Sequence, residues 1–189
     1  MKWIVLLPVL LLLHGVYAQS TSSHPVDEII GYTFEGATTS FKFYQRDGTA
    51  FSTEGEVSRI STSTGWFSGD VDGDGVDEII GYTFEGSTTS FRFYQRDGTT
   101  FSTEGEVSRI STSTGWFSGD VDGDGVDEII GYTDEGATTS FRFYQRDGTT
   151  FSTEGEVSRI STSTGWFSGD VDGDGVDEII GHTFEGATT

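Results

Sequence analysis

The stretch GDVDGDGVDEIIGY, residues 69–82, decides the fold of this chain. It returns unchanged at residues 119–132, and again at residues 169–182 with only its last residue changed, to His182. The rest of the period repeats as closely, because residues 77–116 and 127–166 differ at only two aligned pairs, Phe84/Asp134 and Ser87/Ala137. Self-similarity at a fixed period of 50 residues predicts a repeat architecture, in which each unit packs on its neighbours.

Within one period the sequence has four short β-forming runs, separated by turns that contain glycine. The runs are GWFSG at 65–69, EIIGYTF at 78–84, SFRFYQ at 90–95 and a segment over 101–110. The third run alternates apolar and polar residues, which indicates a strand, and helical periodicity appears nowhere. Four strands in a repeat of about 40 to 50 residues are typical of a β-propeller blade. We therefore predict an all-β fold, a partial β-propeller of about three four-stranded blades.

The sequence predicts fewer first strands than second strands. The repeats supply three first strands, near Trp66, Trp116 and Trp166, but four second strands, near Ile30, Ile80, Ile130 and Ile180. Propellers usually need four to eight blades to close, and an open edge invites association. We expect either a homo-oligomer through open propeller edges, with one second strand displaced, or a chain shortened from a longer array.

The acidic loop in each repeat has the pattern of a calcium loop. Carboxylates at positions 1, 3 and 5 with glycine at position 6 allow a tight turn around a hard cation that takes six to eight oxygens. Position 7 should add a backbone carbonyl and position 9 a closing carboxylate, with Asp77 as the competing choice to Glu78. The predicted ligands are Asp70, Asp72, Asp74, Val76 and Glu78; Asp120, Asp122, Asp124, Val126 and Glu128; and Asp170, Asp172, Asp174, Val176 and Glu178.

Neither an EF-hand nor an acidic loop without an ion fits these residues as well. An EF-hand needs a bidentate glutamate at position 12, where this chain has Gly81, and helices rather than strands on either side. Mg²⁺ keeps its water and rarely uses a cage built only from protein, so Ca²⁺ is favoured. A solvated acidic loop without an ion would hold like charges within about 6 Å of one another, which is costly.

At these residues the sequence resembles the FG-GAP/VCBS repeat family, the calcium-loop β-propeller repeats of integrin α-chains and many secreted or surface proteins. The matching pattern is Gly69-Asp70-x-Asp72-Gly73-Asp74-Gly75, followed by the apolar pair Ile79-Ile80. The Phe-Gly and Gly-Ala-Pro signatures that name the family are missing, so the chain is more similar to the shorter VCBS-type propellers. The resemblance implies calcium binding and a role as an adhesion, ligand-binding or lectin-like module.

The N-terminus predicts export. A positive residue, an apolar run and a small-residue end indicate a signal peptide over residues 1–18, cut after Ala18 and followed by a leader at 19–25 and the repeat array at 26–189. No later segment is apolar enough to cross a membrane, so we expect a secreted, extracellular protein. The net charge of −21 excludes nucleic acid as a partner, and the chain has no cysteine for disulfides.

The leading functional hypothesis is a non-enzymatic module that binds an extracellular protein or a glycan. The alternative is an extracellular hydrolase, such as a glycosidase that uses paired carboxylates. Beyond the predicted signal peptide the only histidines are His24 and His182, so the chain offers few residues for a catalytic pair of a nucleophile and a histidine base. The repeated tryptophans could stack on sugars but are favoured as core. Tyr94, with Arg92 and Arg96, lies either in a groove between blades or on a solvated face.

Overall fold

The computed structural model describes residues 16–20, 27–47, 50–61, 63–97, 100–148 and 150–183. All of the regular structure in these ranges is β-strand. The strands are β1 (Val16–Ser20), β2 (Asp27–Glu35), β3 (Thr38–Asp47), β4 (Ala50–Ser61), β5 (Gly65–Gly69), β6 (Glu78–Glu85), β7 (Thr88–Asp97), β8 (Thr100–Ser111), β9 (Gly115–Gly119), β10 (Glu128–Asp134), β11 (Thr138–Asp147), β12 (Thr150–Ser161), β13 (Gly165–Gly169) and β14 (Glu178–His182).

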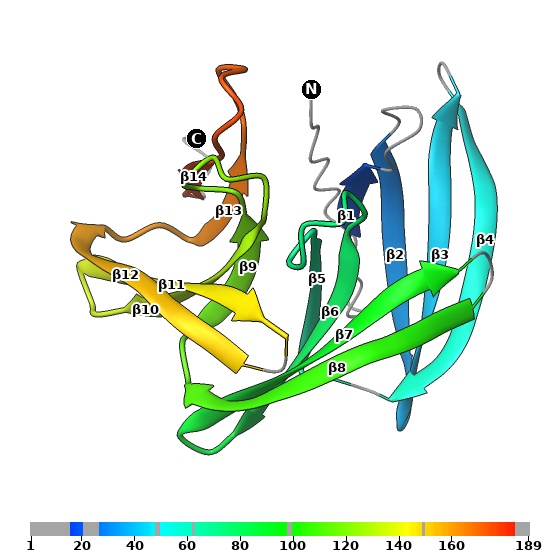
Figure 1. The fold of residues 1–189 in the computed structure, drawn as a ribbon, viewed down its shortest axis with the longest axis horizontal. Helices are drawn as coiled ribbons and strands as arrows, with labels where there is room; N and C mark the ends of the chain where they lie inside the picture. The colour runs from blue at the N-terminus through cyan, green and yellow to red at the C-terminus, as the bar shows by residue number, and fades with distance from the viewer. Residues whose placement is uncertain are drawn as a thin grey trace, which may run out of the picture.

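The strands form four antiparallel sheets in chain order (Figure 1). The first sheet is β1–β4, the second β5–β8, the third β9–β12, and the last holds only β13 and β14 among the described residues. The predicted all-β fold with four-stranded, propeller-type blades is confirmed. A search of the described residues for a helix long and apolar enough to cross a membrane found none.

The predicted number of first strands was wrong, because β1 is a fourth one. Its register with β2 pairs Tyr17 with Ile30, as β5 pairs Phe67 with Ile80 one period later. The sequence of β1, VYAQS, lacks the aromatic and glycine pattern of GWFSG, so only the pairing identifies it. The predicted cleavage after Ala18 falls inside β1 and stays a prediction. Most of the signal peptide and of the leader, residues 1–15 and 21–25, lies outside the described residues.

The hydrophobic core lies between the sheets rather than within one. Successive side chains of a strand point to opposite faces, so Trp66 and Ile79 of the second sheet face the first sheet. Phe67 and Ile80 face the third sheet, where they join Trp116. The second sheet therefore contributes two apolar faces, as the paired apolar residues in the sequence predict.

An aromatic contact repeats at each of these interfaces. Phe91 and Trp116 meet edge to face with ring centroids 4.9 Å apart, and the pairs Phe41–Trp66 and Phe141–Trp166 have the same separation. Such pairs add roughly 0.5–1.5 kcal/mol beyond the area they bury. Trp66 is 1% and Trp116 7% exposed, so these tryptophans are core residues, as favoured from the sequence.

Residues of the first and third sheets are more exposed than their equivalents in the second sheet. Val107 is 5% exposed between the second and third sheets, whereas Val157, one period later, is 49% exposed. Phe51 of the first sheet is 55% exposed, while its equivalent Phe101 packs edge to face on Phe41 with centroids 5.7 Å apart. A neighbouring sheet is what buries these side chains.

Two positions that depart from the repeat are accommodated at strand ends. Asp134 is exposed at the end of β10, where its Oδ1 accepts hydrogen bonds from the hydroxyls of Thr139 (2.9 Å) and Thr162 (3.3 Å). The aspartate that replaces the repeated phenylalanine therefore lies at the rim of the sheet. His182 lies 6.2 Å from Phe167 between ring centroids, the separation of Tyr82 from Phe67, so its ring takes the place of the repeated tyrosine.

Candidate metal centres

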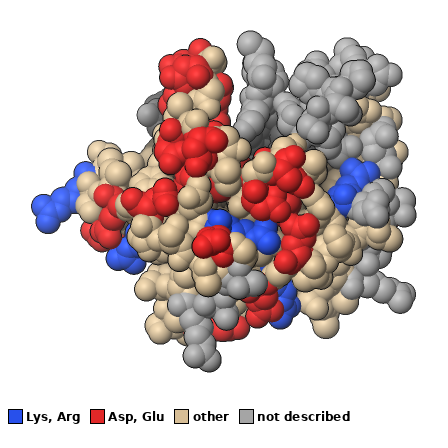
Figure 2. Space-filling view, viewed as in Figure 1, with Lys and Arg blue, Asp and Glu red and all other residues tan. Residues whose placement is uncertain are grey.

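Three acidic groups lie in the loops that join the first and second strands of successive sheets. In each group one oxygen from every carboxylate lies within 4.8 Å of the others. The groups are Asp70, Asp72 and Glu78; Asp120, Asp122 and Glu128; and Asp170, Asp172 and Glu178. The three loops project toward the same end of the molecule, the top of Figure 1. Figure 2 shows acidic side chains gathered over the upper half of this face.

The loop backbone wraps around the first aspartate of each group. In the first loop Asp70 Oδ1 accepts hydrogen bonds from the amides of Gly73 (2.8 Å) and Asp74 (3.1 Å), and Oδ2 accepts one from Gly75 (2.9 Å). Gly73 and Gly75 have φ of 76° and 87°, a left-handed conformation that favours glycine. The glycines of the motif are therefore required by the turn that holds the aspartate.

The glutamate that follows the loop is the most deeply buried member of the first two groups. Glu78 is 0% and Glu128 1% exposed. The Oε2 of Glu78 accepts a hydrogen bond from the Val71 amide (3.2 Å), and that of Glu128 accepts one from Val121 (3.1 Å). In both glutamates Oε1 is buried without a hydrogen-bond partner. Burying a carboxylate in this way is costly unless a cation or proton compensates it.

The pKa values of these carboxyl groups reflect the same cost. Burial, and then the charge of Asp72, raise the pKa of Glu78 to about 8, against a hydrogen bond from Val71 that lowers it. Burial is also the main cause that raises the pKa of Glu128 to about 7. Burial raises the pKa of Asp70, although its backbone hydrogen bonds oppose the shift. A cation among these oxygens would stabilise their charged forms.

The remaining predicted ligands take other positions. Asp74 Oδ1 accepts a hydrogen bond from the Val76 amide (2.9 Å), and Oδ2 accepts one from Gln95 Nε2 (2.7 Å). Asp124 makes the same bonds with Val126 (2.8 Å) and Gln145 (2.8 Å). Asp174 accepts the amide of Val176 at 2.9 Å. The third aspartates therefore lie outside the three-carboxylate groups, and the loop valines take part in these hydrogen bonds through their amides.

Asp77 and Glu78, the two residues between which the sequence left the closing ligand open, have repeat equivalents with different surroundings. Glu78, Glu128 and Glu178 belong to the acidic groups of their own loops, whereas the carboxylates of Asp127 and Asp177 lie against the preceding sheet. The amide of Asp127 donates to the Asp70 carbonyl (2.7 Å), and its carboxylate lies against Gly69 of the second sheet. Asp177 makes the same amide bond to the Asp120 carbonyl (2.7 Å). These aspartates therefore connect neighbouring sheets.

Sequence reasoning missed the glutamine that holds the third aspartate. Gln95 lies 21 residues after Asp74, on the third strand, and nothing in its local sequence indicates the contact. Arg92 and Arg96, for which the sequence allowed either a groove or a solvated face, take different roles. Arg92 pairs with Glu106 on the exposed face at 2.9 Å, and the guanidinium carbon of Arg96 lies 4.0 Å from the Phe43 ring centroid, between sheets.

A comparison with family models is consistent with this geometry. The model of the FG-GAP-like repeat matches residues 70–131 and 120–181, and each match begins at the first aspartate of one loop. The chain belongs to the FG-GAP-like repeat family. FG-GAP-like repeats form β-propeller blades, in agreement with the observed sheets. A search of curated proteins found no match to this FG-GAP-like chain.

The chemistry of the three sites follows from their donors. Every side-chain donor is a carboxylate oxygen, which suits hard cations such as Ca²⁺ and Mg²⁺ rather than metals that prefer nitrogen or sulfur. The buried, unpartnered Oε1 of Glu78 and of Glu128 is the kind of atom that such an ion would compensate. These acidic loops could therefore hold metal ions, as FG-GAP repeats commonly do with calcium.

Proposed function

We propose that this protein is a secreted calcium-binding repeat module that acts as a non-enzymatic adhesion or ligand-binding protein. The observation that carries the calcium assignment is the buried Oε1 of Glu78 and of Glu128. This atom has no hydrogen-bond partner, and each glutamate lies close to two aspartate carboxylates. Ca²⁺ accepts six to eight oxygens in flexible geometry, so it can draw on side chains, backbone carbonyls and water in one loop.

The ion would have a structural role in each blade. Asp70 directly follows β5 and Glu78 begins β6, so a shared Ca²⁺ joins the ends of two paired strands whose carboxylates otherwise repel each other. An ion that binds the folded chain and not the unfolded chain stabilises it by mass action, by about 2.7 kcal/mol per site at 100 times the Kd. In a chain without cysteine this replaces disulfides as the link.

Calorimetric titration of chelator-treated protein tests the assignment directly. We expect about three saturable Ca²⁺ sites per chain, one for each acidic group, and a lower melting temperature in chelator. Glu128→Gln keeps the size of the side chain, removes its charge and should remove one site. Glu156→Gln, on the exposed face where Glu156 pairs with Arg142, is the matched control and should leave the stoichiometry unchanged. No saturable uptake, together with an unchanged melting temperature in chelator, would remove calcium from the proposal.

The adhesion part of the proposal rests on repetition and on the family. FG-GAP repeats are typically extracellular, and identical sites repeated along one chain suit multivalent binding, in which avidity rises without new contacts. The ligand class we propose is a glycan or an extracellular matrix protein. A glycan array and a matrix-protein adhesion assay, both with Ca²⁺ present, should show binding that chelator abolishes.

The same preparation separates this function from a glycosidase. An activity screen on sugar polymers should show no turnover. Turnover that is abolished by one carboxylate substitution outside the loops would instead identify an enzyme and overturn the non-enzymatic part of the proposal.

A further inference from the structure

One arginine of the third sheet is seated on the second sheet. The guanidinium carbon of Arg146, on β11, lies 4.3 Å from the centroid of the Phe93 ring. Its Nη1 lies 3.7 Å from Glu104 Oε2 and 3.9 Å from Asp72 Oδ2, and the side chain is 7% exposed. A Cβ added at Gly105 would lie 3.8 Å from Nη2, an ordinary contact distance, so Gly105 lies against the guanidinium. We name these four residues, Asp72, Phe93, Glu104 and Gly105, the arginine seat.

The preceding interface has the same arrangement. Arg96 of the second sheet places its guanidinium carbon 4.0 Å from the centroid of the Phe43 ring in the first sheet, and its Nη2 lies 3.2 Å from a Cβ added at Gly55. The use of an arginine to fill the space over this phenylalanine is therefore a regular feature of the packing between sheets, repeated at a spacing of 50 residues.

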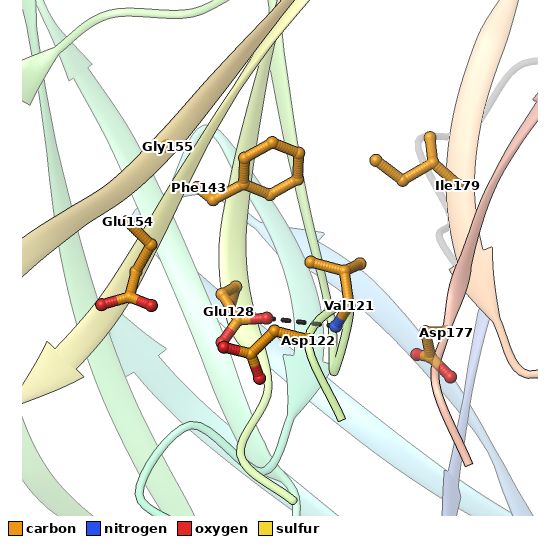
Figure 3. Close-up of a pocket in the computed structure, with 8 residues that line it drawn as sticks. All are labelled: Val121, Asp122, Glu128, Phe143, Glu154, Gly155, Asp177 and Ile179. Carbon is orange, nitrogen blue, oxygen red and sulfur yellow. Dashed lines mark hydrogen bonds between the residues drawn. The ribbon is translucent and has the colours of Figure 1, made fainter. Parts of the chain in front are cut away.

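One period after the arginine seat there is a cavity of about 400 Å³ on the third sheet (Figure 3). Its lining includes the equivalents of all four seat residues. These are Asp122, Phe143, Glu154 and Gly155, and the other lining residues are Val121, Glu128, Asp177 and Ile179. Figure 3 shows Glu154 and Phe143 on one side of the cavity and Asp177 and Ile179 on the other. The cavity is thus an arginine seat that no arginine of the described residues fills.

The lining of the cavity favours a cation with an apolar plane. Four of its eight lining residues carry carboxylates, and none carries a positive charge. Asp122 and Glu128 belong to the second acidic group, so Glu154 and Asp177 are the carboxylates left for a further cation. The Phe143 ring is the repeat equivalent of the Phe93 ring on which Arg146 lies. A guanidinium stacks on an aromatic ring and donates from a planar fork, whereas an ammonium is a compact and strongly hydrated point charge.

We propose that this cavity binds the arginine of an extended peptide segment from a partner protein, which adds as a strand beside β14. Arg146 reaches its seat from β11, the strand that pairs with β10. The equivalent place beside β14 has no strand among the described residues, since β14 pairs there only with β13. A strand added at this edge gains backbone hydrogen bonds while its arginine enters the cavity, the usual logic of recognition by strand addition.

A partner peptide fits this place better than a second copy of the chain. In a second copy the third strands β3, β7 and β11 are already paired with β2, β6 and β10. That copy would have to break this pairing in order to form an equal one with β14. An extended segment without a ladder of its own loses nothing of this kind. This proposal goes beyond calcium binding, because it assigns a ligand to a cavity between sheets.

The probe is a ten-residue peptide with the sequence of β11, TTSFRFYQRD, which carries Arg146 in its natural setting. We expect saturable binding to the full chain in Ca²⁺, measured by fluorescence anisotropy of the labelled peptide. The same peptide with Arg146→Gln should bind at least about tenfold more weakly, since the variant loses the positive charge that faces the carboxylates and the stacking of the guanidinium on the phenylalanine ring.

Substitutions in the protein test the cavity itself. Glu154→Gln should lower the affinity for the peptide by about tenfold. Glu156→Gln, on the same strand but outside the cavity, should leave this affinity within about twofold. Phe143→Leu keeps an apolar side chain and removes the ring face, and it should also weaken binding. Calcium stoichiometry measured on Glu154→Gln should be unchanged, because Glu154 belongs to none of the acidic groups, so failure here is distinguishable from failure of the calcium proposal.

Three results would overturn the proposal. The first is no saturable binding of the β11 peptide. The second is equal binding of the Arg146→Gln peptide. The third is self-association of the free protein, seen by light scattering, that Glu154→Gln abolishes; this would show that the occupant is a second copy rather than a partner.

Discussion

Val71 and Val171 occupy the same position in identical acidic loops, but only one of them is covered by a neighbouring sheet. Val71 is 0% exposed in the core between the second and third sheets, and Val171 is 69% exposed. Valine to alanine removes two methyl groups, at about 0.8 kcal/mol for each buried carbon, and leaves a small cavity. We expect Val71→Ala to lower the free energy of unfolding by about 2 kcal/mol and Val171→Ala by less than about 0.5 kcal/mol.

Urea unfolding in saturating Ca²⁺ measures this difference. With a slope of about 2 kcal/mol/M, Val71→Ala should move the midpoint by about 1 M and Val171→Ala hardly at all. Circular dichroism and tryptophan fluorescence should both be recorded, because repeat arrays can unfold in parts and only coincident curves license one free energy. Equal losses in the two variants would refute the inference that the loop valine is stabilised by the adjacent sheet, since the two loops share one sequence.

Three further outcomes are expected. Gly69→Ala should cost about 1–3 kcal/mol in urea unfolding because its Cβ would collide with the neighbouring sheet, whereas Gly169→Ala, with open space around it, should be nearly neutral. In chelator, the free energy of unfolding should fall as pH rises from about 4.5 to 8, by up to about 1.4 kcal/mol per pH unit. The reason is that the pKa of Glu78 is raised to about 8 in the folded chain, so in this range the folded state binds a proton that the unfolded state has lost. A urea midpoint that does not change across this range would contradict the prediction. Asp134→Phe should change stability by less than about 1 kcal/mol, because a ring contact with Tyr132 like that of Phe84 with Tyr82 offsets the loss of the hydrogen bonds from Thr139 and Thr162; a fall of more than about 2 kcal/mol in urea unfolding would argue against that contact.

The sequence predicted the repeat, the four strands of each blade and the all-β fold, because these depend on local pattern. GWFSG and its acidic loop recur with the spacing of one sheet, and the first strand Gly65–Gly69 has the bounds that the pattern predicts. The strand Val16–Ser20 was missed because backbone pairing with β2, rather than its side chains, makes it a strand.

The sites were predicted less completely, because they depend on which way a side chain points. Asp77 and Glu78 are adjacent, so the alternation of a strand turns them to opposite faces, but composition alone does not say which face is which. The pairing of Asp74 with Gln95 depends on the third strand, 21 residues away. The arginine seat could not be predicted from the sequence for the same reason, since Arg146 contacts residues of another sheet.

In the part of the chain that the structure describes, neighbouring sheets share no strand ladder. The second and third sheets are joined by a backbone hydrogen bond from the Asp127 amide to the Asp70 carbonyl, and the connecting chain is the short segment from Ser111 to Gly115. A gene that gains or loses one 50-residue unit therefore adds or removes one whole sheet and one whole interface, and leaves the contacts of the remaining units in register. Length in such a protein can change by recombination in whole steps, whereas a change at an interface residue has to be tolerated by two units at once.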